Sequence, residues 1–285
     1  MPPGRGEAAA AKGPADRSDM TTSLDSEETL MLDLGLTGKV AIITGGSEGL
    51  GRASAQRLAA EGARVAICAR RADVLERAAE GIRKAGGQVL AKPVDVTQAD
   101  QIEAFVNDVI RQWGGVDILV NNAGTSAAAS FDLVDDVGWQ HDFDLKVFSA
   151  IRLCRLCIPH MKKRGGGRII NVTNLGAKVP QARGLPTSVS RAAGINLTKS
   201  LANEYARDRI LVNTICLGLV KSAQWERRAK GDLDEFYKET AKRIPIGRIG
   251  EAEEFADLVA FLVSERAAYI TGTAINFDGG MAAVV

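Results

Sequence analysis

The sequence is poor in the residues that build metal sites and disulfide frameworks. Of its 285 residues, 2 are His and 4 are Cys. Cys154 and Cys157 are about one helical turn apart and have no second pair nearby, and His141 and His160 have no neighbour at ligand spacing. We therefore expect buried, reduced thiols and no metal site.

Neither sign of charge dominates, and long apolar runs are missing. The 36 Lys and Arg residues nearly balance the 35 Asp and Glu residues, so no strong field draws the chain to nucleic acid or to an anionic membrane. The apolar runs stay well short of the roughly 18 residues of a membrane span, and the N-terminus lacks the apolar segment of a secretory signal. We expect a cytoplasmic protein with a small-molecule substrate and with neither nucleic acid nor membrane as a partner.

Residues 1–35 contain no aromatic side chain and no continuous apolar block, and they are rich in Ala, Gly, Pro and charged residues. Such a composition is typical of disorder, so we predict a disordered tail over this range. The whole chain is 46% hydrophobic and 25% charged, which is ordinary for a globular protein. Residues 36–285 are therefore expected to form a single domain.

From residue 38 onward, short apolar runs alternate with helical segments. The runs are expected to be strands at residues 39–44, 64–68, 88–96, 117–122, 167–173, 209–216 and 273–278. Near-continuous apolar strands separated by amphipathic helices indicate a parallel sheet that is covered on both faces. Because the crossovers must be right-handed, we predict an α/β fold of the Rossmann type with a doubly wound parallel sheet.

The first expected strand ends in the glycine-rich segment TGGSEGLG, residues 44–51. Gly45, Gly49 and Gly51 lie where the strand passes into a helix, so bare backbone can approach a pyrophosphate and the helix N-terminus can face its charge. A tight strand–helix turn would need similar glycines, so the cluster alone decides little. Its position inside a β–α–β unit favours nucleotide binding.

Several motifs in order resemble the short-chain dehydrogenase/reductase family. They are TGGSEGLG, VDV at 94–96, NNAG at 121–124, GRIINVT at 167–173, IPIGRIGEAEE and the late ITGTAINFDGG. The resemblance covers about residues 36–283, and the ordered combination is more specific than any single motif. It implies a nicotinamide cofactor and oxidoreductase activity.

The resemblance also implies which residues contact the cofactor. Asp95 and Val96 would border the adenine, and the NNAG segment would lie beneath the cofactor, although its asparagines could instead form a strand-ending turn. The full set of implied contacts is Gly45, Ser47, Gly49, Leu50, Gly51, Arg70, Asp95, Val96, Asn122, Ala123, Gly124, Arg191, Gly218, Val220 and Ser222.

The end of the second strand indicates which dinucleotide binds. An acidic residue there would hydrogen-bond the ribose 2′-hydroxyl and repel a 2′-phosphate, but this chain has Ala69, Arg70 and Arg71. We expect Arg70, which is nearer the strand, to bind the phosphate, and the other arginine to be a solvated charge. The pattern therefore predicts NADP, with NAD as the other possible cofactor.

The four positions at which the family carries its catalytic residues hold other residues in this chain. By the resemblance, Thr187 and Arg191 align with the family's tyrosine and lysine, Asn174 with its serine, and Lys146 with its helix asparagine. A threonine hydroxyl is too weak an acid near neutral pH, and arginine holds its proton too firmly. Asn174 and Thr187 remain hydrogen-bond donors, and Arg191 is expected to hold the nicotinamide ribose.

Lys146 is the member of this set that can titrate. If it faces the pocket, burial and the Arg191 cation would lower its pKa toward a range useful for an acid or a base. Two other interpretations stay open: a solvated lysine on the surface of a helix, or a salt bridge to Asp142 or Asp144.

These features predict an NADP-dependent oxidoreductase that acts on a carbonyl or alcohol through a non-standard proton relay. The alternatives are non-redox enolate or elimination chemistry, in which Lys146 and Arg191 stabilise an oxyanion, and a non-catalytic nucleotide-binding protein. Two cations in a partly dry pocket are costly unless something negative pairs with them, so we expect an anionic or enolisable substrate.

Two further expectations concern the remaining segments. Residues 219–246 are mixed in character and are expected to cap the pocket as a substrate lid. The helices at 139–163 and 186–207 and the C-terminal segment ITGTAINFDGGMAAVV, residues 270–285, resemble subunit-contact elements of the family, and the apolar residues 281–285 are unlike a free tail. They predict a homodimer or homotetramer.

Overall fold

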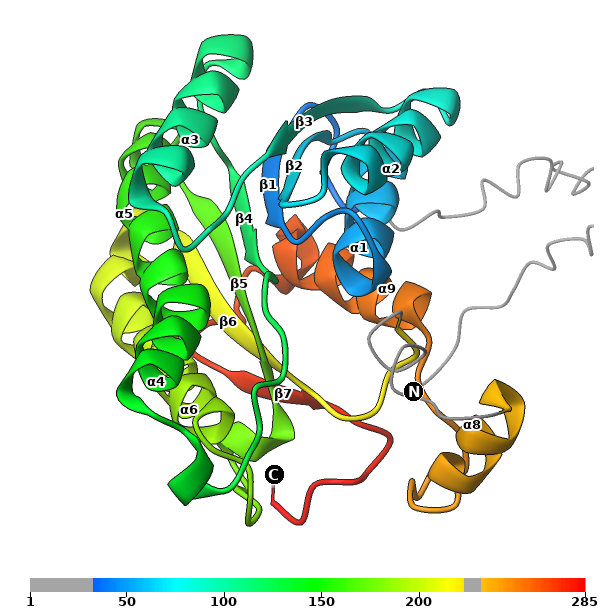
Figure 1. Cartoon of the computed structure of the whole chain (residues 1–285). Coiled ribbons are helices and arrows are strands. Elements are labelled where there is room, and N and C mark those ends of the chain that lie inside the picture. The colour runs from blue at the N-terminus through cyan, green and yellow to red at the C-terminus, as the bar shows by residue number, and fades with distance from the viewer. Residues whose placement is uncertain (1–32, 223–231, 285) are drawn as a thin grey trace, which may run out of the picture. The chain divides into compact units, whose positions relative to one another are not determined.

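The computed structural model describes residues 33–222 and 232–284, and residues 34–285 form one compact unit. In this unit seven parallel strands make a single sheet in the order β3-β2-β1-β4-β5-β6-β7 (Figure 1). The chain thus builds the sheet outward from β1 in one direction and then from β4 in the other, which confirms the doubly wound Rossmann-type fold. The strands are β1 Val40–Thr44, β2 Arg64–Ala69, β3 Gln88–Pro93, β4 Ile118–Asn121, β5 Gly167–Asn174, β6 Ile210–Leu217 and β7 Ala274–Phe277.

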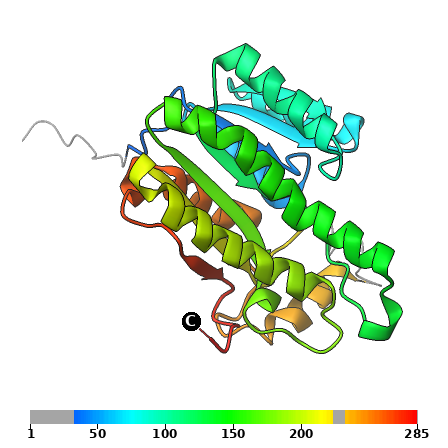
Figure 2. The same cartoon turned by 90° about the vertical axis from the view of Figure 1, so that its left-hand side faces the viewer.

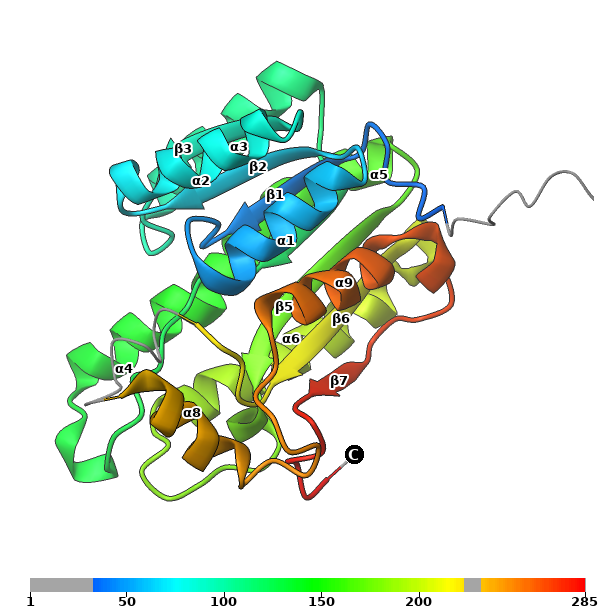
Figure 3. The ribbon, with the colours of Figure 1, turned by 90° about the vertical axis from the view of Figure 1, so that its right-hand side faces the viewer.

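Helices cover both faces of the sheet. One face carries α1 Gly49–Ala60, α2 Ala72–Lys84 and α9 Ala252–Val263, whereas the other carries α3 Ala99–Trp113, α5 Ser149–Lys163 and α6 Thr187–Tyr205 (Figures 2 and 3). The core follows the strand period of two: Ala41 and Ile43 of β1 pack with the first group, and Val40 and Ile42 pack with the second. This two-sided burial explains why the strands read as continuous apolar runs.

The predicted long helix at 139–163 is interrupted by a wider turn. Helix α4 covers Asp136–Phe143, a π-helical turn, η2, covers Asp144–Phe148, and α5 follows directly. Single π-helical turns inside α-helices are rare, and those that occur are often found at functional sites. Lys146 lies in this turn.

The predicted lid is described in part. Within 219–246, helix α8 covers Leu233–Ala241. Asp232 caps its N-terminus, because the Asp232 side chain accepts hydrogen bonds from the backbone amides of Asp234 and Glu235. Residues 223–231 lie outside the described residues, so the lid remains a prediction.

The packed unit begins earlier than the predicted tail boundary at residue 35. Leu34 and Leu36 are buried in the core, and the Leu34 carbonyl accepts a hydrogen bond from the Glu265 amide at 3.3 Å. Leu34 falls within the predicted tail, but its side chain belongs to the core cluster on the face of the sheet that α1, α2 and α9 cover. Residues 1–32 lie outside the described residues.

All four cysteines are buried and free. Burial raises the pKa of both Cys68 and Cys154 to about 12, so these thiols stay protonated, as expected of structural cysteines. Among the described residues, no group of three or more His, Cys, Asp or Glu side chains is placed to hold a metal ion.

None of the helices within 33–222 and 232–284 has the length and apolar character needed to cross a bilayer.

Candidate active site

Thr44 and Asn122 join two strand ends at the carboxyl edge of the sheet. Thr44 Oγ1 accepts hydrogen bonds from the backbone amides of Asn122 and Ala123 at 3.0 and 2.9 Å. In return, Asn122 Nδ2 donates to the carbonyls of Thr44 and Gly45 at 2.9 and 3.3 Å. The segment after β4 is therefore tied directly to the glycine-rich segment after β1.

The glycines of this segment are required by its backbone. Gly45 has a φ of +67°, in the left-handed region, and a Cβ on Gly51 would overlap the Gly45 carbonyl oxygen. The N-terminus of α1 can therefore pack against the end of β1, and Ser47, Gly49 and Leu50 between them are partly exposed. Exposed backbone at a helix N-terminus fits the pyrophosphate of a dinucleotide.

The two arginines after β2 have different surroundings. Arg71 forms an ion pair with Glu48 of the glycine-rich segment. Arg70 is exposed and makes no hydrogen bond or ion pair with the described residues. Arg70 is thus the arginine that is free to bind an anion at the end of β2.

Asp95 and Val96, which the resemblance places beside the adenine, lie in the turn between β3 and α3. Asp95 Oδ1 accepts hydrogen bonds from the amide and the hydroxyl of Thr97 at 3.0 and 2.8 Å, which shapes the turn before α3. The Val96 side chain is buried in the core beneath that helix. For Val96, the backbone is what a cofactor can contact.

The segment that follows β6 returns to the glycine-rich segment. The Gly218 amide donates to the Phe277 carbonyl at 2.9 Å, and Val220 is buried in a bridge with Gly250. The Ser222 Cβ lies 3.8 Å from where a Cβ on Gly49 would stand. The expected contacts on β1 and those after β6 therefore meet at one edge of the sheet.

Lys146 lies inside a buried polar network, so the interpretation of it as a solvated surface residue is wrong. Its side chain is 0% exposed, and it forms an ion pair with Asp142. Lys146 Nζ also donates to Thr187 Oγ1 at 3.0 Å, and this oxygen accepts a second hydrogen bond from the Ala127 amide at 3.0 Å. Ser190 Oγ donates to the other Asp142 oxygen at 2.6 Å.

Two elements bring this network together. Asp142 and Lys146 are four residues apart across the junction of α4 with the π-helical turn, and Thr187 and Ser190 occupy the first turn of α6. Asp144, the other candidate partner of Lys146, lies 3.6 Å from Arg152 instead. Ser190 is an additional member of this network that was not predicted from the sequence. Its position three residues after Thr187, on the same helix face, was the available signal.

The pKa of Lys146 falls to about 8, mainly because the side chain is buried and also because the Arg191 cation is near; the Asp142 carboxylate opposes both effects. A lysine with this pKa gains and loses its proton near physiological pH. The direction and the causes agree with the expectation from the sequence.

Arg191 lies between the end of β5 and Gly124. Its Nη1 donates to the Val172 carbonyl at 2.6 Å, and a Cβ on Gly124 would collide with the guanidinium. Arg191 Nε is buried without a hydrogen-bond partner. Burial lowers its pKa to about 10, so Arg191 stays a cation at neutral pH. It can bind hydroxyls or an anion, but it cannot act as the acid.

A small polar cavity of about 10 Å³ lies beside Lys146 and Arg191. Asn121 and Asn171 also line it; they are joined by a 2.8 Å hydrogen bond, and Asn121 Oδ1 is buried without a partner. This volume and these partners suit a single water molecule.

Asn174 stands apart from the other three predicted catalytic residues. It ends β5, and its Oδ1 is buried without a hydrogen-bond partner. Within the described ranges it makes no hydrogen bond to Lys146, Thr187 or Arg191. Lys146 and Thr187 are therefore joined directly and Arg191 lies near them, whereas Asn174 is outside this hydrogen-bonded network, at the end of the strand whose Val172 carbonyl binds Arg191.

An anionic substrate was expected because two cations in a partly dry pocket need a negative partner. Asp142 supplies that partner from within the protein, with an exposed fraction of 2%. The extra positive charge of the site is then compensated without a substrate. An anionic or enolisable substrate remains a prediction, but the cost of burying an unpaired cation no longer supports it.

Comparison with known proteins gives the family. A family model described as enoyl-(acyl carrier protein) reductase matches residues 45–282. Dehydrogenase/reductase SDR family member 4 of Oryctolagus cuniculus is 35% identical over 251 residues, which cover 86% of this chain and 94% of the relative. The chain belongs to the short-chain dehydrogenase/reductase family.

Other members of the family give the same result. The 3-oxoacyl-[acyl-carrier-protein] reductase FabG of Thermotoga maritima is 34% identical, covering 86% of this chain and 98% of the relative. The structure of L-sorbose reductase of Gluconobacter frateurii, complexed with NADPH and L-sorbose, superposes with a TM-score of 0.87 at 39% identity, covering 89% of this chain and 100% of that one.

A further solved structure is similar over nearly the same part of the chain. The NADPH-bound short chain oxidoreductase of Pseudomonas aeruginosa, described as containing an atypical catalytic center, is 37% identical with a TM-score of 0.84. The match covers 87% of this chain and 99% of that one. The family predicted from the motifs is confirmed, whereas the roles of the individual site residues stay predictions.

Proposed function

We propose that this short-chain dehydrogenase/reductase interconverts a carbonyl and an alcohol with NADP(H), and that Lys146 supplies or accepts the proton through Thr187. Two similar structures contain NADPH. The residues of this chain fit that cofactor: glycines at the N-terminus of α1, no acidic residue at Ala69, and an unpaired Arg70 at the end of β2. Bound NADPH would supply the hydride.

The hydrogen bond between Lys146 Nζ and Thr187 Oγ1, at 3.0 Å, is the observation that carries the proposal. Thr187 Oγ1 accepts from Lys146 and from the Ala127 amide, so its own hydrogen is left to donate to a substrate oxygen. A threonine hydroxyl alone is too weak an acid, but a relay needs it only to pass a proton on.

In the reduction direction, negative charge develops on the carbonyl oxygen as the carbon receives hydride. Thr187 gives its proton to that oxygen and takes one from the Lys146 ammonium, so the products are an alcohol and a neutral lysine. Oxidation runs through the same residues in reverse. The lowered pKa of Lys146, about 8, suits both directions near neutral pH.

Asp142 and Ser190 are positioning residues in this scheme. The Asp142 carboxylate binds Lys146 with one oxygen and accepts from Ser190 with the other at 2.6 Å. A carboxylate held from both sides keeps the amine pointed at Thr187. Arg191 carries a permanent charge beside Gly124, and we assign it to the nicotinamide ribose and to the developing oxyanion.

The test is a substrate screen that measures NADPH absorbance. Loss of NADPH is followed with ketoses, 3-oxoacyl thioesters and simple ketones, and formation of NADPH is followed with the corresponding alcohols and NADP⁺. Lys146→Arg keeps a cation for Asp142 but cannot release its proton, and Lys146→Met removes the charge. We expect both variants to lose about a hundredfold or more in kcat on any substrate that the wild type turns over, because this is the usual contribution of a general acid.

Lys163→Met serves as the matched control, because Lys163 is an exposed lysine on the same run of helix. It should leave kcat unchanged, and all three variants should bind NADPH as the wild type does in a fluorescence titration. Full activity of Lys146→Arg would refute the relay but leave the oxidoreductase assignment standing. No turnover by the wild type across the screen, together with no NADPH binding, would refute the assignment itself. The cytoplasmic location and the homo-oligomer stay predictions.

A further inference from the structure

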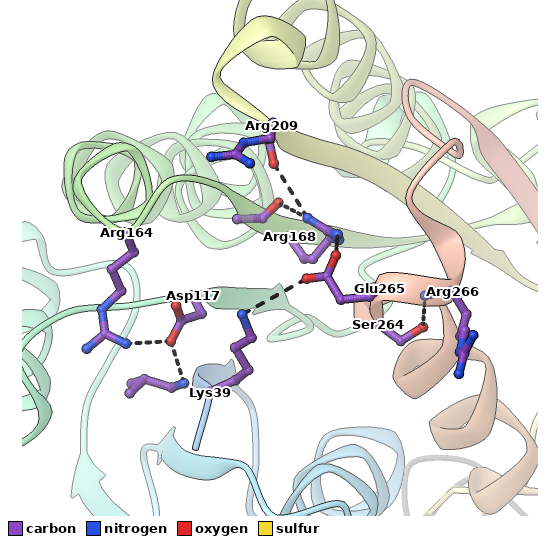
Figure 4. Close-up of polar contacts among 10 residues, drawn as sticks. Lys39, Asp117, Arg164, Arg168, Arg209, Ser264, Glu265 and Arg266 are labelled. Carbon is purple, nitrogen blue, oxygen red and sulfur yellow. Dashed lines mark hydrogen bonds and ion pairs between the residues drawn. The ribbon is translucent and has the colours of Figure 1, made fainter. Parts of the chain in front are cut away.

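A second polar cavity, of about 270 Å³, lies at the amino ends of the strands. Figure 4 shows the polar contacts among the charged residues that line it. Its walls come from the residues that precede β1, β4 and β6, from the start of β5, and from η5, Glu265–Ala267. The cofactor residues lie at the carboxyl ends. Since β5 has eight residues of about 3.3 Å each, the two edges are roughly 25 Å apart.

Four cationic side chains and two carboxylates line this cavity: Lys39, Arg164, Arg168, Arg209, Asp117 and Glu265. Asp117 and Arg164 are committed to the fold. Asp117 Oδ2 accepts from the Val40 amide and from Arg164 Nη1, both at 2.7 Å, and Arg164 Nη2 donates to the Trp113 carbonyl at 2.7 Å. The other lining charges have fewer or longer contacts.

Arg168 is a buried cation with incomplete partners. The residue is 9% exposed, and its Nη2 donates to Glu265 Oε2 at 3.2 Å. Its Nη1 donates to the Gly167 carbonyl at 3.1 Å and to the Arg209 carbonyl at 3.5 Å. Its Nε is buried without a hydrogen-bond partner. Burial lowers the pKa of Arg168 although the Glu265 carboxylate opposes this. Buried polar atoms in native proteins usually have partners, so this orphan donor needs an explanation.

Glu265 is the carboxylate that two cations share. Besides Arg168, Lys39 Nζ lies 4.0 Å from its other oxygen, and the Glu265 side chain is 62% exposed. A side chain held at these distances and open to solvent is weakly fixed. A dissolved anion can therefore compete with it for Arg168 and Lys39.

Arg209 adds a cation that nothing in the described part of the chain neutralises. Its guanidinium makes no hydrogen bond or ion pair with the described residues. Its φ is +58°, a left-handed conformation that is unfavourable for a long side chain. The local backbone would be easier for Gly or Asn, yet an arginine stands at the wall of the cavity.

We propose that this cavity is a second binding site, for a small phosphate- or carboxylate-bearing molecule, separate from the cofactor site. The anion takes the place of the Glu265 carboxylate between Arg168 and Lys39, and it adds a contact to Arg209. Guanidinium groups bind both kinds of oxyanion through paired hydrogen bonds. A cavity of about 270 Å³ holds a small metabolite and is too small for a dinucleotide.

The test is calorimetric titration of the full chain at low ionic strength, with the cofactor site saturated by NADP⁺. Inorganic phosphate, pyrophosphate and succinate are the probes, so the arms distinguish a phosphate from a carboxylate ligand. We expect one site per chain that weakens as salt is added. Arg168→Met and Arg209→Asn should each lower the affinity, the first by about tenfold or more. Asn suits the left-handed backbone at 209.

Glu265→Gln makes the test decisive, because it removes the internal competitor and should raise the affinity severalfold. Arg207→Gln, an exposed arginine outside the cavity, is the matched control and should bind as the wild type does. Absence of binding by both the wild type and Glu265→Gln would overturn the proposal. Binding that Arg209→Asn and Glu265→Gln leave unchanged, or that NADP⁺ abolishes, would overturn it as well.

Discussion

At the scale of single residues, the pKa of Lys146 reflects two opposed influences. Burial and the nearby Arg191 favour the neutral amine, whereas the Asp142 carboxylate favours the ammonium. The first two prevail, and the pKa falls from 10.5 to about 8. Of its neighbours, Thr187 does not titrate near pH 8, and Arg191, with a pKa of about 10, is still protonated there. One side chain of the site is therefore expected to govern its pH dependence.

We predict opposite pH profiles for the two reaction directions. Reduction needs the protonated lysine, so kcat should fall about tenfold per pH unit above a midpoint near 8. Oxidation needs the neutral amine, so kcat should rise up to the same midpoint and then level off. Stopped-flow measurement of both directions between pH 6 and about 10 measures the two midpoints.

Asp142→Asn provides the second half of this experiment. Removing the carboxylate removes the influence that favours the ammonium, so both midpoints should move to lower pH. A midpoint that stays fixed in Asp142→Asn, or identical profiles for the two directions, would contradict the assignment of the titrating group to Lys146.

At the scale of elements, the ends of β1, β2, β4 and β6 carry residues that are predicted to contact the cofactor. Thr44 and Asn122 join the first and third of these ends, and Ser222 reaches back toward Gly49. The end of β2 differs because it presents side chains: Arg71 is paired with Glu48, and Arg70 is unpaired within the described residues. Cofactor choice should therefore depend on Arg70.

We predict that Arg70→Ala lowers the affinity for NADPH by about ten- to a hundredfold, because a charge-assisted contact to the 2′-phosphate is lost. The affinity for NADH, which lacks this phosphate, should hardly change. Calorimetric titration with both nucleotides measures the effect.

Arg71→Ala is the matched control, since it removes an adjacent arginine that is already paired with Glu48. It should reduce the preference for NADPH less than Arg70→Ala does. The prediction is wrong if Arg70→Ala keeps the full preference, or if the wild type binds the two nucleotides equally.

At the scale of the whole molecule, exposed apolar side chains occur on elements that were predicted to contact another subunit. Phe148 in the π-helical turn is 40% exposed, and Val189 on α6 is 42% exposed. Strand β7 is the last strand of the sheet beyond β6, so within the described part of the chain one side of it has no neighbouring strand. Apolar side chains and an open edge are both features that a second subunit can cover.

We predict a dimer or tetramer at micromolar concentration, measured by light scattering with size-exclusion chromatography. The double variant Phe148→Glu/Val189→Glu should lower the mass to a smaller oligomer or a monomer, because charge cannot be buried in an apolar contact. Tyr269→Glu, at a fully exposed position outside the predicted contacts, should leave the mass unchanged. A monomeric wild type would contradict the prediction.

The sequence by itself determined the features that depend on local physics. Short β-branched runs gave the strands because a buried strand must be apolar on both faces, and Gly45 and Gly51 marked the first strand–helix turn because only glycine fits its φ and its close packing. The ordered motifs were then sufficient to predict the family. Burial and reduction of the cysteines also followed from spacing alone.

The tertiary structure decided what depends on residues far apart in the chain. From the sequence, Lys146 was compatible with the surface, with a salt bridge or with the site. The packing of α6 against the π-helical turn buries it, and it then has both the salt bridge to Asp142 and a 3.0 Å hydrogen bond to Thr187. Likewise, Lys39, Arg168, Arg209 and Glu265 belong to four separate segments, and no spacing in the sequence relates them. They share a cavity because parallel strands place all their amino ends at one edge of the sheet.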